Sequence, residues 1–217
     1  MAEFDEVVRH RRMTRAFSSE PIDPAVVDAL VDLASRAPSA GKTQGWHLVV
    51  LEGEQTKRFW DISLPAEKRA AFRWTHLLDA PVIALPLADA GAYTSRYAEP
   101  DKARTGLGAG SDVWPVPYWT IDTSMSVMTL LLAAEDVGLG ALFFGVFHNE
   151  AALRAELGIP HDLELLGAIA LGHRRTSDDQ GQVDDLGGSS DESEAGPGRS
   201  SGRRRRTPVQ IIHRNGW

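Results

Sequence analysis

The sequence predicts a domain built from both α-helices and β-strands, and three observations lead to this prediction. Apolar residues recur at helical spacing over residues 24–34, which is typical of an amphipathic helix. Short apolar runs at 81–87 and 165–171 have the length of buried strands. A run at 123–137 is apolar on nearly all sides, as expected of a helix in the core or at a subunit interface.

In the first half of the chain, helices are expected to alternate with two strands. A first amphipathic helix is expected from Phe4 to Arg11. A second helix is expected to begin with Asp23 as its N-cap and Pro24 at its first helical position. Pro38 follows the end of that helix. The remaining elements expected here are a strand at 47–51, helices at 55–61 and 66–78, and a strand at 81–87.

The second half begins with residues 88–119, which are rich in Gly, Pro and aromatic residues. We expect them to form a long loop or lid, with a flexible glycine-rich stretch at 106–110. Asp122 is expected to cap the apolar helix at 123–137, which Gly138 ends. The later elements expected are a strand at 141–146, a helix at 150–157 capped by Asn149 and stopped by Gly158, and a strand at 165–171.

Composition divides the chain into three parts. Residues 1–175 form the predicted domain, because apolar periodicity continues throughout them. Residues 176–202 are an acidic insert rich in Ser and Gly, with almost nothing apolar, and such composition is typical of disorder. Residues 203–217 are a basic arm. Its four arginines are followed directly by the apolar run 209–213, which favours docking as a strand or extended arm over a free charged tail.

Charge and residue usage exclude several classes of function. The net charge of -7 argues against a general nucleic-acid binder. The chain has no cysteine, and its seven histidines do not show a metal-ligand spacing, so no metal site is predicted. The N-terminus lacks the pattern of a signal peptide, and no apolar run reaches the length of about 18 residues that a membrane span needs. We therefore expect a cytoplasmic protein that does not enter a membrane.

Three arginines lie within five positions at the end of the first helix: Arg11, Arg12 and Arg15. Guanidinium groups hold phosphate through charge-assisted hydrogen bonds, so the cluster is a candidate anion site in an otherwise acidic chain. The same cluster is also compatible with a solvated basic helix end, which the helix dipole favours.

Two glycine-containing segments resemble nucleotide motifs but fail on spacing. A P-loop that ends at Gly41 and Lys42 would need glycine at position 36, where Arg36 stands. The glycines at 106–110 have the wrong spacing for a dinucleotide fingerprint, and no strand precedes them. Residues 37–46 join a helix to a strand, and could either hold the polar edges of a ring or form an ordinary turn.

Four segments in this order resemble the nitroreductase family. They are Arg-Arg-Met-Thr-Arg-Ala-Phe at 11–17, Pro-Ser-Ala-Gly-Lys-Thr-Gln-Gly-Trp at 38–46, Glu-Asp-Val-Gly-Leu-Gly-Ala with the following Phe-Phe-Gly at 135–145, and the basic ending at 204–217. The similarity runs from about residue 4 to 175 and resumes after 203. Each segment is weak alone, and the four in the right order carry the assignment.

The resemblance implies an α+β fold with a central, mostly antiparallel sheet flanked by helices, in an intertwined homodimer whose core contains the helix at 123–137. It implies FMN bound non-covalently at the subunit interface and NAD(P)H as cosubstrate. No side-chain acid or base is assigned, because flavin N5 would accept a hydride and pass electrons to an acceptor in a ping-pong cycle. Nitroaromatics and quinones are the acceptors to test.

The resemblance also implies which residues contact FMN. The arginines would hold its phosphate, Ser39 and Gln44 would lie beside the ring and ribityl chain, and a backbone N–H at residues 144–145 would approach N5. The full set is Arg11, Arg12, Met13, Arg15, Pro38, Ser39, Lys42, Gln44, Phe144, Gly145, Arg204 and Arg206.

Three positions depart from the family pattern. Met13 stands where serine is frequent, and Lys42 and Gly45 stand where Asn and Pro are common. Lys42 could stabilise negative charge on reduced flavin or could point into solvent. The aromatic residues of 88–119 could line an acceptor pocket or wrap a dimer.

Other functions stay open at this point. One is a flavin-sequestering or flavin-modifying protein of the same fold with little nitroreductase turnover, and relatives that remove halogens reductively are a further case. Another is an interaction module that uses the acidic insert and the basic arm.

Overall fold

The computed structural model describes residues 3–175 and 205–216. The chain divides into two compact units, Met1–Gly181 and Gln182–Trp217. The expected acidic insert at 176–202 lies outside the described residues. Among the residues that are described, no helix has the length and apolar character to cross a membrane.

A five-stranded antiparallel sheet forms the centre of the first unit. Its strands are β1 (Trp46–Glu52), β2 (Val82–Asp89), β3 (Gly140–Phe144), β4 (Leu163–Leu165) and β5 (Ala168–Gly172). The order across the sheet is β1-β2-β5-β3, and β4 pairs with the far end of β2. Helices and an antiparallel sheet in one domain confirm the predicted α+β class.

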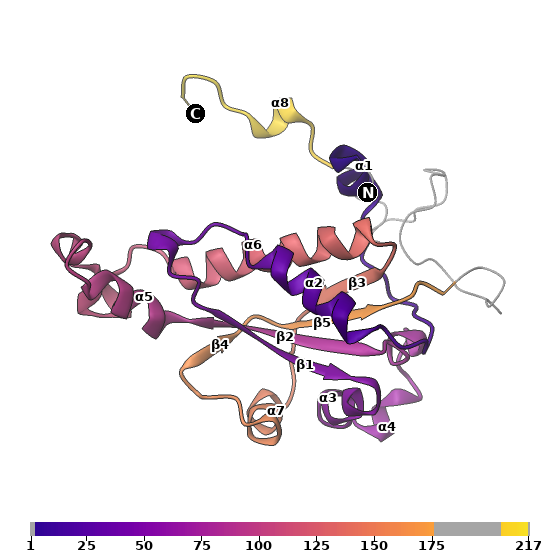
Figure 1. Cartoon of the computed structure of the whole chain (residues 1–217). Coiled ribbons are helices and arrows are strands. Elements are labelled where there is room, and N and C mark those ends of the chain that lie inside the picture. Colours follow the sequence, from indigo (N-terminus) through magenta and orange to yellow (C-terminus); the bar gives the residue numbers. More distant parts are fainter. Residues whose placement is uncertain (1–2, 176–204, 217) are drawn as a thin grey trace. The chain divides into compact units, whose positions relative to one another are not determined.

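Helices cover both faces of this sheet (Figure 1). Helices α2 (Pro24–Ala34) and α6 (Tyr118–Asp136) lie on one face, and α3 (Thr56–Ser63) and α7 (Glu150–Leu157) lie on the other. Strand β2 is buried on both faces, so its alternate side chains enter two separate hydrophobic clusters.

The remaining elements are shorter. They are the helices α1 (Phe4–His10), α4 (Ala66–Arg69), α5 (Ala90–Ala98) and α8 (Pro208–Ile211), and the 3-10 turns at Ala40–Lys42, Gly53–Gln55, Thr75–Leu77, Ala103–Thr105, Leu107–Ala109 and Ser111–Val113. Helix α8 belongs to the second unit.

Local capping signals predicted helix ends with mixed success. Asp23 caps α2 as expected, with its carboxylate accepting a 2.9 Å hydrogen bond from the Ala25 amide, and Gly158 ends α7 with φ 65°. The expected cap at Asn149 is wrong, because its side chain does not cap α7. It donates instead to the Ile62 carbonyl at 2.8 Å, which ties the start of α7 to α3.

Three other expectations are wrong in their boundaries or in the kind of element. The helix expected at 66–78 is only α4 and the 3-10 turn Thr75–Leu77. The strand expected at 165–171 is broken into β4 and β5 at Gly167, whose φ of 147° suits glycine. The strand or extended arm expected at 209–213 is replaced by α8, where Thr207 and Gln210 form a capping box.

The long loop expected at 88–119 is also wrong, because this segment is folded. Asp89 caps α5 by accepting a 3.0 Å hydrogen bond from the Ala92 amide. Trp114 is buried, its ring packs edge-on against Tyr97, and its Nε1 donates to the Leu107 carbonyl at 2.9 Å. The glycines at 106–110 lie in 3-10 turns packed on α5, rather than in a flexible lid.

The apolar helix begins earlier than expected. Helix α6 starts at Tyr118, directly after Pro117, so Asp122 lies inside the helix and does not cap it. The buried side of α6 contacts the sheet. A row of partly exposed apolar side chains, which we call the α6 apolar row, lies at a spacing of three or four residues: Tyr118, Ile121, Met125 and Met128.

Candidate functional site

The arginine segment is held against the first residues of β3. Met13 pairs with Ala141, and the Thr14 amide donates a 2.9 Å hydrogen bond to the Ala141 carbonyl. Gly140 permits this approach, since a Cβ there would lie 2.8 Å from the Thr14 side chain. Met13 itself packs against the hydrophobic clusters on both sides of the sheet. Backbone pairing with β3 therefore fixes the position of the segment that carries the three arginines.

The three arginines differ in what they contact. Within the described part of the chain, Nη1 of Arg11 is buried and has no hydrogen-bond partner. Arg12 is exposed and donates to the carbonyls of Arg9 and Arg11. Arg15 donates to the Met13 carbonyl at 3.2 Å, and its guanidinium lies 5.5 Å from the centre of the Trp74 ring. A buried N–H without a hydrogen-bond partner destabilises the folded state. An anion beside Arg11 would provide the missing hydrogen-bond acceptor.

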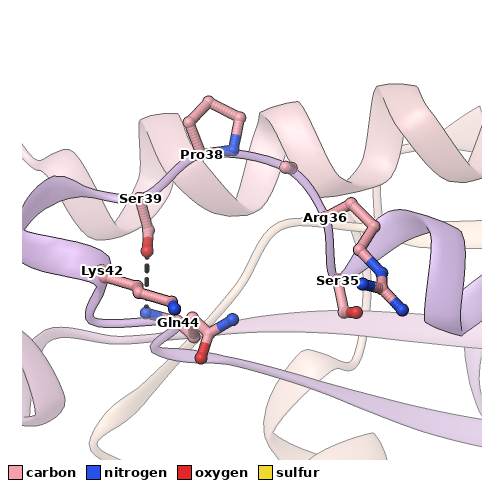
Figure 2. A pocket seen from close by; sticks show the side chains of 7 residues that line it. Ser35, Arg36, Pro38, Ser39, Lys42 and Gln44 are labelled. Carbon is pink, nitrogen blue, oxygen red and sulfur yellow. Dashed lines mark hydrogen bonds between the residues drawn. The ribbon is translucent and has the colours of Figure 1, made fainter.

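The second group of predicted residues lies in the connection between α2 and β1, which we call the Ser39–Gln44 loop (residues 39–44). The Ser39 hydroxyl accepts a 2.9 Å hydrogen bond from the Gln44 amide and closes the loop, as Figure 2 shows. The Thr43 hydroxyl donates to the Ala40 carbonyl at 2.6 Å. Gly41, Lys42 and Gln44 have φ values of 62°, 56° and 54°. The lysine and the glutamine therefore occupy a left-handed conformation that L-residues with long side chains rarely adopt.

An open pocket of about 490 Å³ lies against this loop (Figure 2). It brings together four of the predicted residues, Pro38, Ser39, Lys42 and Gln44, and it is otherwise lined by Ser35, Arg36 and Ala37. Arg36 pairs with Asp32 at 3.1 Å, whereas Lys42 is exposed at the pocket. The lining does not include the arginine segment or Phe144.

Two departures from the family pattern have a structural consequence. A Cβ on Gly45 would lie 2.8 Å from the Tyr93 ring and 3.1 Å from the Asp89 carbonyl oxygen. A proline at position 45 would therefore collide with α5 in this arrangement. Asparagine tolerates the left-handed conformation better than lysine, so the residue common at position 42 suits the observed φ.

Sequence reasoning missed the residues that anchor the loop. The Asp122 carboxylate on α6 accepts a 2.8 Å hydrogen bond from the Ala40 amide and a 2.7 Å hydrogen bond from the Tyr93 hydroxyl. Arg96 on α5 donates from Nε to the Gly41 carbonyl at 3.0 Å. Burial raises the pKa of Tyr93 above its ordinary value, and the hydrogen bond to Asp122 raises it further. Asp122 itself was the signal that could have found these anchors, because a carboxylate buried in a largely apolar helix needs polar partners.

The third group of predicted residues lies at the end of β3. The Phe144 ring stacks on Trp60, with centroids 5.9 Å apart and planes 4° apart, so this partly buried side chain packs against the core. Gly145 follows directly. The ring of Phe147 lies where a Cβ on Gly145 would be, and Phe147 itself is 86% exposed. An exposed aromatic ring thus covers the backbone at Gly145.

The arginines expected from the basic arm lie outside the first unit. Arg204 is not among the described residues. Arg206 belongs to the second unit, where it donates to the Gln210 carbonyl. Their contact with FMN therefore stays a prediction. Among the residues for which the structure gives positions, no group of three or more His, Asp or Glu could hold a metal ion.

Comparisons with known proteins give one matching family model and several relatives. The model of the nitroreductase family matches residues 8–173. A protein of Archaeoglobus fulgidus, provisionally named NADH dehydrogenase/NAD(P)H nitroreductase, is 27% identical over 188 residues, in an alignment that covers 85% of this chain and 93% of that protein. The 5,6-dimethylbenzimidazole synthase of Rhodobacter capsulatus is 29% identical over 186 residues, covering 80% of this chain and 84% of the synthase.

The solved structures show the same fold. A crystal structure from Desulfovibrio desulfuricans, described provisionally as a nitroreductase in complex with FMN, superposes with a TM-score of 0.65. The sequence identity is 21%, and the superposition covers 100% of this chain and 99% of that one.

Proposed function

This chain belongs to the nitroreductase family, and we infer that it is an FMN-dependent oxidoreductase that takes its electrons from NAD(P)H. We further propose that its acceptor is an electron-poor organic molecule, such as a nitroaromatic or a quinone. Bound FMN would supply the hydride chemistry, and the protein would supply binding and orientation.

The observation that carries the proposal is the buried Nη1 of Arg11, which lacks a partner in the described part of the protein. It lies in a segment with two further arginines that β3 holds in place. A phosphate offers acceptor oxygens and negative charge, so it fits this group better than a neutral ligand does. Arg11, Arg12 and Arg15 are therefore proposed to hold the FMN phosphate.

The spacing along β3 supports a ligand with a phosphate at one end and a ring at the other. Met13 pairs with Ala141, and Gly145 follows four residues later. An extended strand rises about 3.3 Å per residue, so about 13 Å separates the two places. We propose that the backbone N–H at Gly145 approaches the flavin ring, and that the Phe147 ring moves aside to admit it.

Ser39 and Gln44 are proposed to contact the ring edges from the Ser39–Gln44 loop, and Pro38 is proposed to pack beside the ring. They line a pocket that does not include the arginines of the same chain. A site at a subunit interface, as the resemblance implies, would allow these groups to come from two protomers. The α6 apolar row supports such an interface, since Met125 is 41% exposed and Met128 is 40% exposed.

The dimer can be tested separately from the cofactor. Light scattering on the wild-type chain is expected to give twice the 23.6 kDa mass of the chain. Met125→Glu, which places a charge in the α6 apolar row, is expected to shift the protein toward the monomer. Leu33→Glu is the matched control, because Leu33 is an exposed apolar residue on the neighbouring helix α2 and lies outside that row. A wild-type monomer would contradict the interface.

The cofactor and the reaction are tested on the purified protein. Mass spectrometry of the released ligand is expected to identify FMN, and anaerobic NADH or NADPH is expected to bleach the flavin absorbance. Addition of a quinone or a nitroaromatic compound should restore the absorbance. A colourless protein that does not bind added FMN would refute the proposal.

A second candidate function rests on the similarity to the Rhodobacter synthase. In this case the protein would sequester or modify flavin and show little nitroreductase turnover. The same anaerobic experiment separates the two functions. Slow bleaching without re-oxidation by any acceptor, together with a changed mass of the released flavin, would favour modification over acceptor reduction.

A further inference from the structure

Asp122 is the buried charged group that connects the predicted site to the core of the domain. It is 6% exposed and lies in the second turn of α6. Its Oδ2 atom accepts both the Ala40 amide at 2.8 Å and the Tyr93 hydroxyl at 2.7 Å. Within the described residues, neutral donors and not a cation stabilise this carboxylate.

The loop that Asp122 holds cannot maintain its conformation by local preference. Lys42 and Gln44 both have positive φ, and such residues persist only where surrounding contacts determine their geometry. The Ser39 hydroxyl closes the loop internally, but it does not connect the loop to the body of the domain. Asp122 does so from α6 and Arg96 does so from α5.

The two anchors differ in burial and in direction. Arg96 forms an ion pair with Asp101, in which Nη1 and Oδ1 are 2.7 Å apart, and its Nε donates to the Gly41 carbonyl of the loop. Asp122 contacts the residue directly after Ser39, and the same oxygen binds Tyr93, which packs against Gly45. One carboxylate oxygen on α6 therefore holds the loop at Ala40 and α5 at Tyr93.

We propose that Asp122 is a positioning residue that holds the Ser39–Gln44 loop in the conformation required for cofactor binding. The proposal rests on the proposed function in one respect, the assignment of Ser39 and Gln44 to FMN. Asp122 acts through the Ala40 backbone and is not itself proposed to touch the cofactor. The loop requires a hydrogen-bond acceptor at this place and not a negative charge.

The test compares three variants of the full-length chain, with and without added FMN. Asp122→Ala removes the acceptor. Asp122→Asn keeps an amide oxygen that can accept two hydrogen bonds. Thr123→Val is the matched control, because Thr123 is the next residue of α6, is 1% exposed, and has a buried hydroxyl without a partner in the described structure.

Hydrogen exchange measures the loop directly and does not depend on activity. In Asp122→Ala, the peptide covering residues 37–45 is expected to exchange about tenfold faster, while β2 exchanges as in the wild type. Asp122→Asn and Thr123→Val are expected to stay within about threefold of the wild type. Unchanged exchange of the loop in Asp122→Ala would overturn the proposal, as would equal acceleration throughout the domain.

FMN binding supplies the second measurement. The dissociation constant is expected to rise about tenfold in Asp122→Ala and to return to within about threefold in Asp122→Asn. In a double-mutant cycle with Ser39→Ala, the two effects should combine to less than their product, because both act through one loop. Multiplicative effects would indicate that Asp122 acts elsewhere, and an Asn variant as weak as the Ala variant would show that the charge is needed.

Two outcomes are kept distinct by this design. If the wild-type chain binds no FMN, the proposed function fails, whereas the exchange comparison still decides whether Asp122 holds the loop. Should Asp122→Ala not fold, the double variant Asp122→Leu with Tyr93→Phe decides. It fills the space with apolar atoms and leaves no tyrosine hydroxyl unpaired, while Ala40 still loses its acceptor. Loop exchange in this double variant equal to that of the wild type would then overturn the proposal.

Discussion

The Phe144 ring stacks on Trp60 with centroids 5.9 Å apart, and this contact joins the end of β3 to α3. The Phe59 ring also packs edge-on against the Phe144 ring, with centroids 6.0 Å apart. The side chain of Phe144 therefore faces the core, while the backbone that follows it leaves the sheet at Gly145. The packing of the Phe144 side chain thus holds the end of β3 directly before the place where the cofactor ring is proposed to lie.

Phe144→Ala is expected to lower the free energy of unfolding by about 2–4 kcal/mol, because it removes a partly buried ring that stacks on Trp60 and packs against the core. Phe147→Ala is the matched control, because it removes the same ring from a position that is 86% exposed. It should change the free energy of unfolding by less than about 0.5 kcal/mol. Urea unfolding of both variants measures the difference. Equal losses would contradict a stabilising contact between Phe144 and the core.

The arginines are expected to contribute unequally to FMN affinity. Arg11→Ala should raise the FMN dissociation constant about ten- to 150-fold, which corresponds to the roughly 1.5–3 kcal/mol of a charge-assisted contact. Arg12→Ala should have a smaller effect, because Arg12 is exposed and already bonded to two backbone carbonyls. Fluorescence titration of flavin-free protein measures both constants.

Arg9→Ala provides the control for charge alone. Arg9 lies on α1 close to this segment in sequence, is exposed, and has Asp5 as its partner at 3.8 Å. Its loss should leave FMN affinity within about twofold of the wild type. An effect of Arg9→Ala as large as that of Arg11→Ala would mean that general positive charge, and not a specific contact, binds the cofactor.

Local signals in the sequence were sufficient for much of the fold. Asp23 and Pro24 predicted the start of α2, and the apolar runs predicted β1, β2 and β3 to within two residues. Helix α5 was missed although Asp89 caps it, since the many glycines and aromatic residues after it are typical of loops. In this segment the packing of Trp114 against Tyr97 stabilises a folded structure, although the local sequence is typical of a loop.

The residues of the candidate site could be predicted mainly from the resemblance to a family, and only in part from charge and spacing in the sequence. Ser39 and Gln44 were named by their match to the family, and the structure joins them by one hydrogen bond. The role of Asp122 could not be inferred, because its partners at Ala40 and Tyr93 are 82 and 29 residues away in the sequence. No periodicity or capping rule reports a contact of that range.

Lys42→Asn is expected to stabilise the protein slightly. The backbone at Lys42 has φ 56°, and asparagine occupies this region at lower cost, so the free energy of unfolding should rise by about 0.5–1 kcal/mol. Lys57→Asn is the control, because Lys57 is exposed in α3 and asparagine is the poorer helix former there. Thermal unfolding should therefore move in opposite directions for the two variants.

The same variant distinguishes the two roles considered for Lys42. If the ammonium group stabilises negative charge on reduced flavin, Lys42→Asn should lower the flavin midpoint potential. If it points only into solvent, the potential should match that of the wild type. Lys57→Asn again controls for the loss of one positive charge.

Tyr93 is expected to make the stability of the fold depend on pH in the alkaline range. Burial, followed by the hydrogen bond to Asp122, raises the pKa of Tyr93 above the ordinary value of 10.0. Above about pH 10 the unfolded chain releases the tyrosine proton while the folded chain retains it, so the unfolded state binds fewer protons and stability falls as pH rises. The contribution of Tyr93 is fully present below about pH 10, and each pH unit above it removes up to about 1.4 kcal/mol until the folded group also ionises.

Unfolding measured from about pH 8 to about pH 11 tests this dependence in wild type, Tyr93→Phe and Tyr118→Phe. Tyr93→Phe should be less stable than the wild type at the lower end of this range, because Asp122 loses a donor, and its stability should fall less steeply at the upper end. Tyr118 is 38% exposed, so Tyr118→Phe should follow the wild-type slope. Parallel slopes for wild type and Tyr93→Phe would show that Tyr93 ionises equally in both states, which its burial beside a carboxylate argues against.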